Sequence, residues 1–351
     1  MTRRIFNEEA LLQMTHDRIR SLDTTHRGSV ATDDPCYVVG VDIGGTNLRL
    51  ALADGNGAIE ARWACSTAGL RDAEVVVQLI KQGVEHLLAQ HPAANQSLRA
   101  IAAGAPGITD VEAGIVIATS YLMGWRDVPL RAMLEEAFDI PAVVDNDVNL
   151  AALGESWAGA AKDAGDFVFL AIGTGIGAGI MLNGQLFRGA SWAAGEIGYM
   201  LISGVPDVSA KRGEPGALES MSGGEGIRAQ WQNHFRPESN APADDLTATQ
   251  IFDRALDGDP PAQALLQQTA VALSRAIYNI ALVLNCPLFV LGGSVGMHPA
   301  LIDATRAALA TLNMRTPPRL LHSVLGVDAQ LIGAIRLALL TAAVSGRPPI
   351  L

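Results

Sequence analysis

Apolar residues in this chain occur in two kinds of pattern, short runs of strand length and longer stretches with helical spacing. The short runs predict strands over residues 38–43, 48–52, 98–105, 142–144, 167–172, 179–182 and 288–291. Apolar residues that recur every three or four positions predict helices over residues 72–90, 128–138, 150–161, 247–256, 260–284, 299–312 and 331–344. Because strands and helices alternate along the chain, the pattern predicts an α/β protein.

The first 36 residues have a different pattern from the rest. Residues 8–22 predict one amphipathic helix, and residues 24–35 form a polar segment typical of a linker. The basic residues at the start are not followed by an apolar stretch, so the segment does not resemble a secretory signal. We expect no membrane span, because the longest uncharged run, residues 167–182, is short for a bilayer and is interrupted by glycines.

A strand, a glycine turn and a second strand follow one another twice in the chain. Asp42 precedes the first turn, Gly44-Gly45-Thr46, and the second turn is Gly173-Thr174-Gly175. Glycine permits a tight turn and lets a phosphate group approach backbone N–H groups closely. The repeat predicts two related lobes that each present a phosphate-binding turn. Two ordinary glycine hairpins are the alternative interpretation.

The composition narrows the possible functions. The formal net charge is −11, which argues against a general nucleic-acid surface but not against binding of ATP through local N–H groups. The three cysteines are scattered, which indicates a reducing compartment and favours neither a disulfide framework nor a cysteine metal site. The seven histidines show no metal-ligand spacing, and no Walker-type phosphate loop is present in the sequence.

The polar segment Asp145–Asn149 follows a predicted buried strand and opens a predicted helix. Phosphoryl transfer needs a carboxylate beside the acceptor hydroxyl, and Asp147 is the candidate that accepts its proton. Asn146 is a candidate to hold the substrate by hydrogen bonds. The structural alternative is that these residues cap the helix, because Asp and Asn are preferred at that position.

Three further segments carry candidate residues. Glu196 and Glu219 lie in polar insertions and can accept hydrogen bonds from a polyol, although each taken singly is typical of a solvated loop. Gly292 and Gly293 follow a predicted strand, where they can lie under an adenine or a ribose. A strand-to-helix turn with two glycines is common, so this last signal is weak when taken alone.

Taken together, these residues resemble the ROK family of sugar kinases and related repressors, within the actin/hexokinase-like ATPases. The resemblance covers residues 37–345 and implies a two-lobed α/β fold, ribonuclease H-like, with a cleft between the lobes. It is carried by several sequence blocks in the same order: 41–49, 105–107, 124–130, 146–152, 173–177, 195–198, 291–293 and 331–334. Any one block is a weak signal, whereas the ordered set is specific.

The resemblance implies transfer of the ATP γ-phosphate to a sugar hydroxyl, with the 6-hydroxyl of a hexose expected, as in a glucokinase. It implies that Asp147 is the catalytic base and that Asp42 holds magnesium, directly or through water. The implied sugar contacts are Asn146, Glu196, Glu219, Gly107, Tyr199 and Tyr121. The implied ATP and phosphate contacts are Gly44, Gly45, Thr46, Asn47, Thr174, Gly175, Gly292 and Gly293.

The chain departs from the family pattern at a structural zinc site that many members carry. Tyr199 stands where those members have a His, and Ala210, Arg212 and Ala217 stand where they have Cys. Because all four ligands are absent together, we predict no zinc. Tyr199 and Tyr121 also change the rim of the implied sugar site, which leaves the identity of the sugar open.

The expected organisation is a leader over residues 1–36, a small lobe over 37–144 and a large lobe over 145–330. The last helix, residues 331–346, is expected to return to the small lobe. The expected location is the cytoplasm, and the expected partners are a sugar and ATP, with neither nucleic acid nor membrane. By resemblance we expect a homodimer.

Two other functions compete with a kinase. A ROK-type sugar-sensing transcriptional regulator would carry a helix-turn-helix domain before the first strand, whereas about 36 residues with a single good helix stand there. A non-catalytic sugar-binding protein of the same fold is the other alternative, and the substituted rim residues Tyr121 and Tyr199 favour it.

Overall fold

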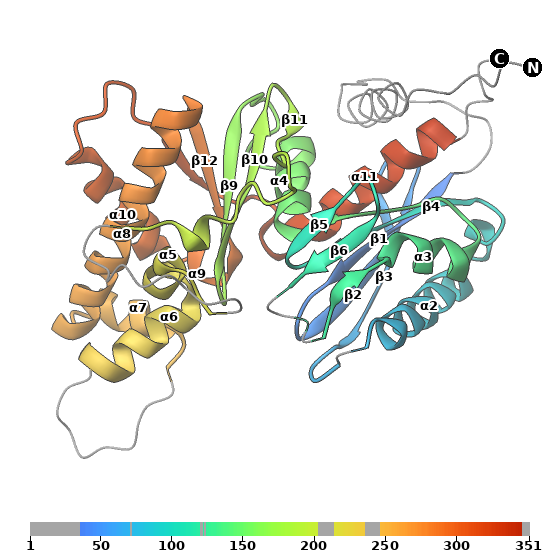
Figure 1. Cartoon of the computed structure of the whole chain (residues 1–351), viewed down its shortest axis with the longest axis horizontal. Helices are drawn as coiled ribbons and strands as arrows, with labels where there is room; N and C mark the ends of the chain where they lie inside the picture. Colours follow the sequence, from blue (N-terminus) through green and yellow to red (C-terminus); the bar gives the residue numbers. More distant parts are fainter. Residues whose placement is uncertain are drawn as a thin grey trace, which may run out of the picture. The chain divides into compact units, whose positions relative to one another are not determined.

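The computed structural model describes residues 36–70, 72–119, 122, 124–202, 214–235 and 246–345 (Figure 1). The chain divides into two compact units. Unit 1 contains the described residues up to Leu153, the segment Leu182–Leu186 and the described residues from Gln330 onward. Unit 2 contains Gly154–Met181 and Phe187–Ala329. The helix predicted over residues 8–22 lies outside the described residues.

The first sheet has five strands in the order β3-β2-β1-β4-β8. Strands β1, β2 and β3 pair antiparallel, whereas β1, β4 and β8 pair in parallel. Their bounds are β1 (Tyr37–Ile43), β2 (Asn47–Asp54), β3 (Ile59–Ser66), β4 (Leu98–Ala105) and β8 (Ala142–Asn146). The sequence pattern predicted β4 with the observed bounds and did not predict β3, whose alternate residues are exposed at this edge of the sheet.

The two faces of β1 are covered by different helices. Val39, Val41 and Ile43 belong to a core cluster with residues of α2 (Ala73–Gln90) and α3 (Leu130–Phe138). Gly40 lies on the opposite face, where an added Cβ atom would approach Ile335 of α11 (Ala329–Ser345) to 2.9 Å. Successive side chains of a strand point to opposite faces, so the alternation along β1 separates these two layers.

Helix α11 corrects the expectation that no segment is long and apolar enough to span a membrane. Together with the preceding turn it gives one stretch, Gly326–Ser345, that meets the length and hydropathy of a span, and 39% of the stretch is buried in the protein. Leu331, Ile335 and Ala338 are fully or almost fully buried. Leu331 and Ile335 lie beside Gly40 of β1, so part of the apolar surface of this helix is buried in unit 1.

A small antiparallel sheet of three strands, β5-β6-β7, was not predicted from the sequence. It consists of β5 (Ile108–Asp110), β6 (Ile115–Ala118) and β7 (Arg126–Val128), and a short 3-10 turn, η1 (Pro92–Ala94), precedes β4. Val128 pairs in β7 with Val116, so helix α3 starts later than the predicted position and Pro129 precedes it. Such short strands carry too few residues for a periodic signal.

The second sheet repeats the arrangement of the first, in the order β11-β10-β9-β12-β13. Strands β9 and β10 form an antiparallel hairpin, whereas β9, β12 and β13 pair in parallel. The bounds are β9 (Phe167–Ile172), β10 (Ile176–Leu182), β11 (Gln185–Leu186), β12 (Leu288–Gly292) and β13 (Arg319–His322). Strand β10 starts at Ile176, before the predicted residue 179. The similarity between the two sheets is not limited to the strand–turn–strand pattern but includes the arrangement of all five strands.

The helices of unit 2 include the long α8, which has the predicted bounds. Thr247 caps α7, because its hydroxyl accepts a hydrogen bond from the Gln250 N–H and the Gln250 side chain accepts one from the Thr247 N–H. The bounds are α5 (Ala217–Ser222), α6 (Gly224–Gln230), α7 (Ala248–Leu256), α8 (Pro260–Leu284), α9 (Gly293–Gly296) and α10 (Pro299–Ala310). The short 3-10 helices are η2 (Ile197–Tyr199) and η4 (Gly326–Asp328), and η3 (Trp231–Phe235) is a π-helix.

Helix α4 (Asp147–Ala158) starts three residues before the predicted residue 150, and the division between the units falls inside it, not at residues 144 and 145. Leu150 packs within unit 1, where a Cβ on Gly333 would collide with its carbonyl oxygen. Glu155 accepts hydrogen bonds within unit 2 from the Ser323 hydroxyl and the Leu325 N–H. The two ends of one helix therefore belong to different cores.

Candidate functional site

The first predicted phosphate turn connects β1 to β2 in unit 1. The Gly44 N–H donates a hydrogen bond of 2.8 Å to the Asn47 carbonyl and closes the turn. A Cβ atom on Gly44 would lie 2.9 Å from that carbonyl oxygen, so a side chain does not fit there. Thr46 and Asn47 are exposed, and the Asn47 amide donates to the Thr46 hydroxyl over 3.1 Å. The turn therefore exposes polar groups at the end of a buried strand.

Thr67, which the sequence pattern did not single out, supports this turn from the end of β3. It is fully buried, its hydroxyl donates to the Gly44 carbonyl over 2.8 Å, and its N–H donates to the Thr46 carbonyl over 2.9 Å. Thr67 lies 23 residues after Gly44, so no local signal connects the two. The hydrogen bonds hold the turn in one conformation.

Asp42 is the buried penultimate residue of β1 and forms an ion pair with Arg49 of β2. The Arg49 Nε and Nη2 atoms donate to Asp42 Oδ2 over 2.8 and 2.5 Å. Burial raises the pKa of the Asp42 carboxyl above its usual range, and the Arg49 charge and hydrogen bond oppose that rise. The predicted magnesium ligand is thus already paired with a cation in this structure.

Asn146 connects the start of α4 with the loop after β4. Its side-chain oxygen accepts hydrogen bonds from the Val148 and Asn149 N–H groups, over 2.9 and 3.0 Å, as a helix N-cap does. Its amide nitrogen donates to the Gly107 carbonyl over 2.9 Å and to Asp147 Oδ1 over 3.1 Å. The side chain predicted to hold the sugar is therefore engaged in hydrogen bonds inside the protein.

Asp147, the predicted base, occupies the first turn of α4 and is partly exposed. Its Oδ1 atom accepts hydrogen bonds from the Val148 N–H, over 2.9 Å, and from the Asn146 amide. The partial positive charge at a helix N-terminus stabilises a carboxylate there. The two hydrogen bonds orient the group, and an oriented carboxylate can accept a proton from a hydroxyl.

Gly107 lies where only glycine fits. Its φ is +96°, and a Cβ atom would come within 2.2 Å of the Ala118 carbonyl oxygen. Asp42, Gly104 and Asp145 pair in register across the parallel strands β1, β4 and β8. The structure therefore places Asp42, the Gly107 loop and Asp147 along one edge of the first sheet, at the carboxyl ends of its parallel strands, where open α/β sheets commonly bind ligands.

The second predicted phosphate turn joins β9 and β10 in unit 2 and packs against the start of α6. The Gly224 N–H donates to the Gly173 carbonyl over 2.8 Å, and the Glu225 N–H donates to the Thr174 carbonyl over 3.1 Å. A Cβ on Gly223 would lie 3.1 Å from the Gly175 Cα. The sequence pattern did not select the segment 223–225, whose glycines permit this close approach.

Gly292 and Gly293 lie beside the same turn in unit 2. Gly292 pairs with Ala171 in the sheet, and a Cβ on it would collide with the Phe169 ring at 2.4 Å. Gly293 has a φ of +80°, and its Cβ would lie 2.4 Å from the Ile172 carbonyl oxygen. The structure thus brings Thr174 and Gly175 together with Gly292 and Gly293, as one group of closely packed backbone segments.

Glu196 and Glu219 are neighbours in unit 2. Glu219 Oε2 accepts a hydrogen bond of 3.0 Å from the Ile176 N–H at the start of β10. Glu196 is an exposed residue. Desolvation of its carboxyl raises its pKa, and the nearby Glu219 charge raises that pKa further. Two carboxylates held close together can accept hydrogen bonds from neighbouring hydroxyl groups of a polyol.

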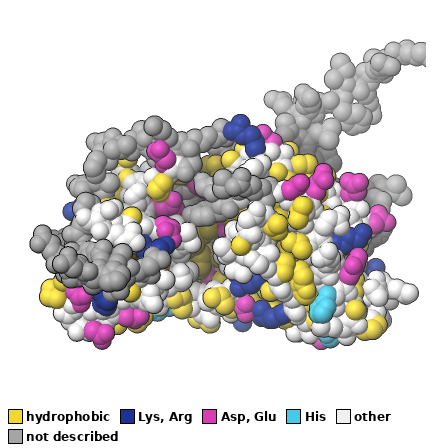
Figure 2. Space-filling model, turned by 90° about the horizontal axis from the view of Figure 1, so that it is seen from below, with side chains coloured by type: hydrophobic (Ala, Val, Ile, Leu, Met, Phe, Trp, Pro, Cys, Tyr) yellow, Lys and Arg dark blue, Asp and Glu magenta, His cyan; other side chains and the backbone are white. Residues whose placement is uncertain are grey.

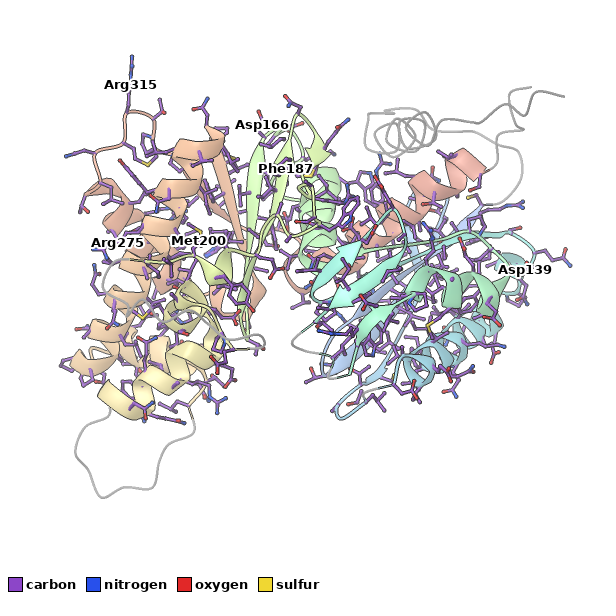
Figure 3. The ribbon with its side chains drawn as sticks, viewed as in Figure 1. Asp139, Asp166, Phe187, Met200, Arg275 and Arg315 are labelled. Atoms are coloured by element: carbon purple, nitrogen blue, oxygen red, sulfur yellow. The ribbon has the colours of Figure 1, made fainter. Side chains whose placement is uncertain are left out.

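The residues at the predicted sugar rim differ in how far the structure describes them. Tyr199 ends η2 and is 48% exposed, and Met200, labelled in Figure 3, follows it directly. Ala217 begins α5 and offers no metal ligand, as predicted from its residue type. Tyr121, Ala210 and Arg212 lie outside the described residues, so the absence of zinc stays a prediction.

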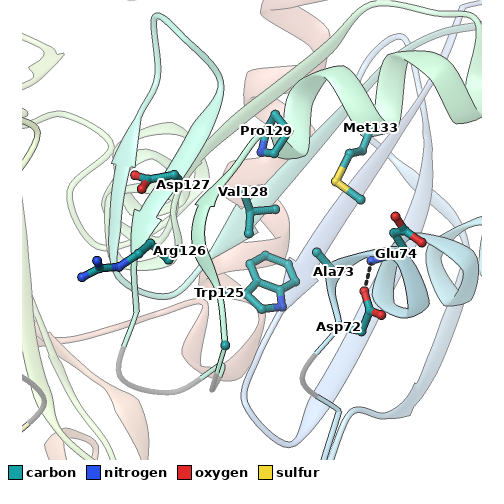
Figure 4. A pocket seen from close by; sticks show the side chains of 10 residues that line it. Asp72, Ala73, Glu74, Trp125, Arg126, Asp127, Val128, Pro129 and Met133 are labelled. Atoms are coloured by element: carbon teal, nitrogen blue, oxygen red, sulfur yellow. Dashed lines mark hydrogen bonds between the residues drawn. The ribbon is translucent and has the colours of Figure 1, made fainter.

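A cavity of about 620 Å³ lies in unit 1 between the start of α2 and strand β7 (Figure 4). Asp72 and Glu74 border it on one side, Arg126 and Asp127 on the other. Trp125, which belongs to the 124–130 sequence block, lines it and is 3% exposed. None of the described residues that line this cavity is a predicted catalytic or phosphate-binding residue, so the cavity is separate from the group around Asp147.

The repeated sheets define an α/β protein with the two-lobed actin-like ATPase fold, which solved ROK hexokinase and glucokinase structures share. The crystal structure of a ROK family glucokinase from Streptomyces griseus, in complex with glucose and AMPPNP, aligns with a TM-score of 0.72. The alignment covers 86% of this chain and 99% of that one at 27% identity. The fold class predicted from the sequence is confirmed.

The chain belongs to the ROK family, whose pattern matches residues 38–340. A glucokinase from Halalkalibacterium halodurans is 33% identical over 266 residues, which cover 74% of this chain and 80% of the glucokinase. A xylose repressor from Caldicellulosiruptor bescii is 27% identical over 270 residues, which cover 73% of this chain and 65% of the repressor. The resemblance seen in the sequence blocks is thus confirmed at the level of the family.

Proposed function

We propose that this protein is a carbohydrate kinase that transfers the γ-phosphate of ATP to a sugar hydroxyl, with the 6-hydroxyl of a hexose as the expected acceptor. The similarity to a glucokinase and to a glucokinase structure with AMPPNP supports a kinase. The observation that carries the proposal is the orientation of the Asp147 carboxylate by Asn146 and the Val148 N–H at the start of α4.

In this proposal Asp147 accepts the proton of the acceptor hydroxyl, so that the oxygen can attack the terminal phosphorus while ADP leaves. Removal of that proton in the transition state contributes roughly 10²- to 10⁴-fold to the rate. Asn146 acts chiefly by holding the Asp147 carboxylate, because both hydrogens of its amide are engaged within the protein. Positioning of this kind is the main work in phosphoryl transfer.

In unit 2, the residues proposed to bind the sugar are Glu196, Glu219 and Tyr199. In unit 1, the proposed sugar contact is the Gly107 loop. The two carboxylates suit a ligand with several neighbouring hydroxyl groups, and the exposed Tyr199 ring suits the apolar face of a sugar ring. Tyr199 and Tyr121 give the rim larger and less polar side chains than the His and Asn of many family members. The proposed acceptors are therefore a hexose, an amino sugar or a modified polyol.

The turns Gly44–Asn47 and Gly173–Gly175 are proposed to bind the phosphates, with Gly292 and Gly293 on the nucleotide side. Magnesium is expected as part of the Mg·ATP substrate, where it neutralises phosphate charge. Mg²⁺ is commonly held by one or two carboxylates together with substrate phosphates, and Asp42 fits as one such carboxylate. Among the described residues no group of three or more His, Cys, Asp or Glu side chains is arranged to hold a metal by itself.

A coupled assay of ADP release over hexoses, N-acyl hexosamines and pentoses tests the proposal. We expect turnover with at least one hexose or hexosamine, and an Asp147→Asn variant that loses about 10³-fold in kcat while it still binds the sugar. Asp139→Asn is the matched control, because Asp139 ends α3 in the left-handed conformation (φ 53°), which Asn adopts readily (Figure 3). A blank screen, or full turnover by Asp147→Asn, rejects the proposal.

A sugar-sensing transcriptional regulator is the second candidate, because a xylose repressor is among the similar proteins. On the face drawn in Figure 2, Lys and Arg side chains occur in small separate groups between acidic ones, without a continuous basic stripe. A gel-shift assay with genomic fragments at several salt concentrations distinguishes the two functions. Specific, salt-dependent retardation would favour the regulator. In either case we expect a cytoplasmic protein that forms a homodimer.

A further inference from the structure

Asp42 and Arg49 face each other directly across the pair of strands that carries the first glycine turn. The β1–β2 register places Asp42 opposite Arg49. Directly opposite residues of an antiparallel pair have neighbouring side chains on the same face of the sheet. This face is the one that packs against α11, because Val41 and Leu48, the adjacent residues, belong to the core cluster on the other face. The ion pair is therefore fixed by the strand register.

The guanidinium group of Arg49 makes three hydrogen bonds to side chains in the described part of the chain. Its Nε and Nη2 atoms both donate to Asp42 Oδ2, over 2.8 and 2.5 Å, and Nη2 also donates to Gln330 Oε1 in α11 over 3.3 Å. Asp42 is only 6% exposed. Within the described part of the chain, no donor is recorded for the other carboxylate oxygen, Oδ1. Arg49 thus occupies one oxygen of Asp42 and fixes the orientation of the other.

The second hairpin indicates that such a pair is not needed to form the turn. Its register places Ala171 opposite Gly177, at the positions that correspond to Asp42 and Arg49. The β9–β10 hairpin forms with these two uncharged residues. A charge pair at the first hairpin therefore has a role other than closing a hairpin.

The electrostatics indicate what that role is. The charge of Arg49 offsets that of the Asp42 carboxylate and repels any cation that approaches it. A hydrated Mg²⁺ ion is reluctant to lose water and needs either several carboxylates or phosphate oxygens. A single buried carboxylate already paired with an arginine does not meet that need.

We propose that Arg49 is a positioning residue that holds Asp42 in place and prevents free divalent cations from binding there, so that the metal enters only together with the triphosphate. This inference rests on the proposed use of Mg·ATP. It assigns to Arg49 a role through Asp42, not a direct contact with the reacting atoms. The consequence is that the protein alone has no divalent-cation site at Asp42, whereas removal of the Arg49 charge creates one.

Binding of Mn²⁺, which has the ligand preference of Mg²⁺ and is visible by electron paramagnetic resonance, tests the inference on the full chain without sugar or turnover. For the wild-type protein we expect Mn²⁺ binding only when AMPPNP is present. For Arg49→Met, a substitution that keeps the length of the side chain, we expect Mn²⁺ to bind the protein alone about tenfold or more tightly than it binds wild type. Arg49→Lys keeps the charge and should exclude Mn²⁺ as the wild type does.

The controls test whether the gain in Mn²⁺ binding arises at Asp42 or from the general loss of a positive charge. Arg62→Met removes an exposed arginine from the neighbouring strand β3 and should leave Mn²⁺ binding unchanged. The gain in Arg49→Met should disappear in the double variant Asp42→Asn/Arg49→Met, because the proposed effect acts through Asp42. A gain that persists without Asp42, or an Arg49→Met protein that binds no more Mn²⁺ than wild type, overturns the inference.

If Arg49→Met fails to fold, Mn²⁺ binding to the wild-type protein and to Asp42→Asn tests the inference. Tight Mn²⁺ binding to the wild-type protein without nucleotide, abolished by Asp42→Asn, contradicts the inference. Nucleotide-dependent Mn²⁺ binding that Asp42→Asn weakens supports it. Because none of these measurements requires phosphorylation of a sugar, they distinguish a wrong role for Arg49 from a blank ADP-release screen, which would reject the kinase itself.

Discussion

The two glycine hairpins have similar turn sequences, but the structure surrounds them with different groups. The β1–β2 turn has a partly buried ion pair beside it, between Asp42 and Arg49, and a buried threonine, Thr67, behind it. Among the described residues, no such ion pair or buried threonine accompanies the β9–β10 turn, which is packed instead against backbone segments at Gly223–Gly224 and Gly293. The comparison teaches that the same local motif serves as a charged, hydrogen-bonded site in unit 1 and as a close-packed backbone site in unit 2.

The carboxylates near the two turns differ in the same way. Asp42 in unit 1 is neighboured by the cation Arg49, which lowers its pKa against the effect of burial. Glu196 in unit 2 is neighboured by another carboxylate, Glu219, which adds to the rise in its pKa. Attraction to Arg49 holds the Asp42 carboxylate in one orientation. Repulsion between Glu196 and Glu219 favours binding of a ligand that donates hydrogen bonds to them.

The largest expected effect on stability comes from an alanine in the first turn, compared with an alanine in the second. Gly44→Ala brings a Cβ within 2.9 Å of the Asn47 carbonyl, so we expect a loss of about 1–3 kcal/mol in the free energy of unfolding and weaker nucleotide binding. Gly173→Ala is the matched control, because its Cβ would meet no atom within 4 Å, and its unfolding free energy should stay within about 0.5 kcal/mol of wild type. Denaturant unfolding measures both, and equal losses would remove the distinction between the turns.

A smaller effect is expected at Thr67, which has no counterpart at the second turn. Thr67→Val keeps the shape of the side chain and deletes the hydroxyl that donates to the Gly44 carbonyl. The loss of one buried hydrogen bond should lower the free energy of unfolding by about 1–2 kcal/mol. Thr67→Ser keeps the hydroxyl and should recover most of that loss. If valine and serine behave alike in denaturant unfolding, the hydroxyl does not support the turn.

The smallest effect concerns the pH dependence of stability at Glu196. Its pKa is raised in the folded protein, so the folded state binds more protons than the unfolded state between the ordinary glutamate pKa and the raised value. Stability therefore falls as pH rises through that window. Glu196→Gln removes this contribution. At pH values above the window, the melting temperature of the variant should be slightly higher than that of the wild type. At pH values below the window, the two melting temperatures should converge.

Thermal unfolding from pH 4 to pH 8 measures this difference. Glu214→Gln is a suitable control, because Glu214 is exposed in the same unit and its substitution should leave the profile of the wild type unchanged. A profile for Glu196→Gln that runs parallel to that of wild type at every pH would mean that the pair Glu196–Glu219 carries no repulsion in solution.

Much of the fold followed from the sequence alone, because the signals for long elements are local. Strand β4 and helix α8 have the predicted bounds, since their apolar residues repeat over many positions. The two glycine turns and the ordered sequence blocks were enough to identify the family. The sequence blocks also indicated Gly107, Asn146 and Asp147 as site residues, and the structure brings these three together. No local pattern predicted the hydrogen bonds that the Asn146 side chain makes within the protein.

The tertiary structure decided what depends on residues far apart in the chain. Thr67 supports a turn 23 residues before it, Arg49 reaches Gln330 across 281 residues, and Glu219 binds the Ile176 N–H across 43 residues. No periodicity encodes such contacts, because strand pairing and helix packing set which distant side chains meet. The sequence alone therefore determined which chemical groups are available for binding and catalysis. The packing of each sheet with its helices determined which of these groups are ion-paired, held by hydrogen bonds or exposed.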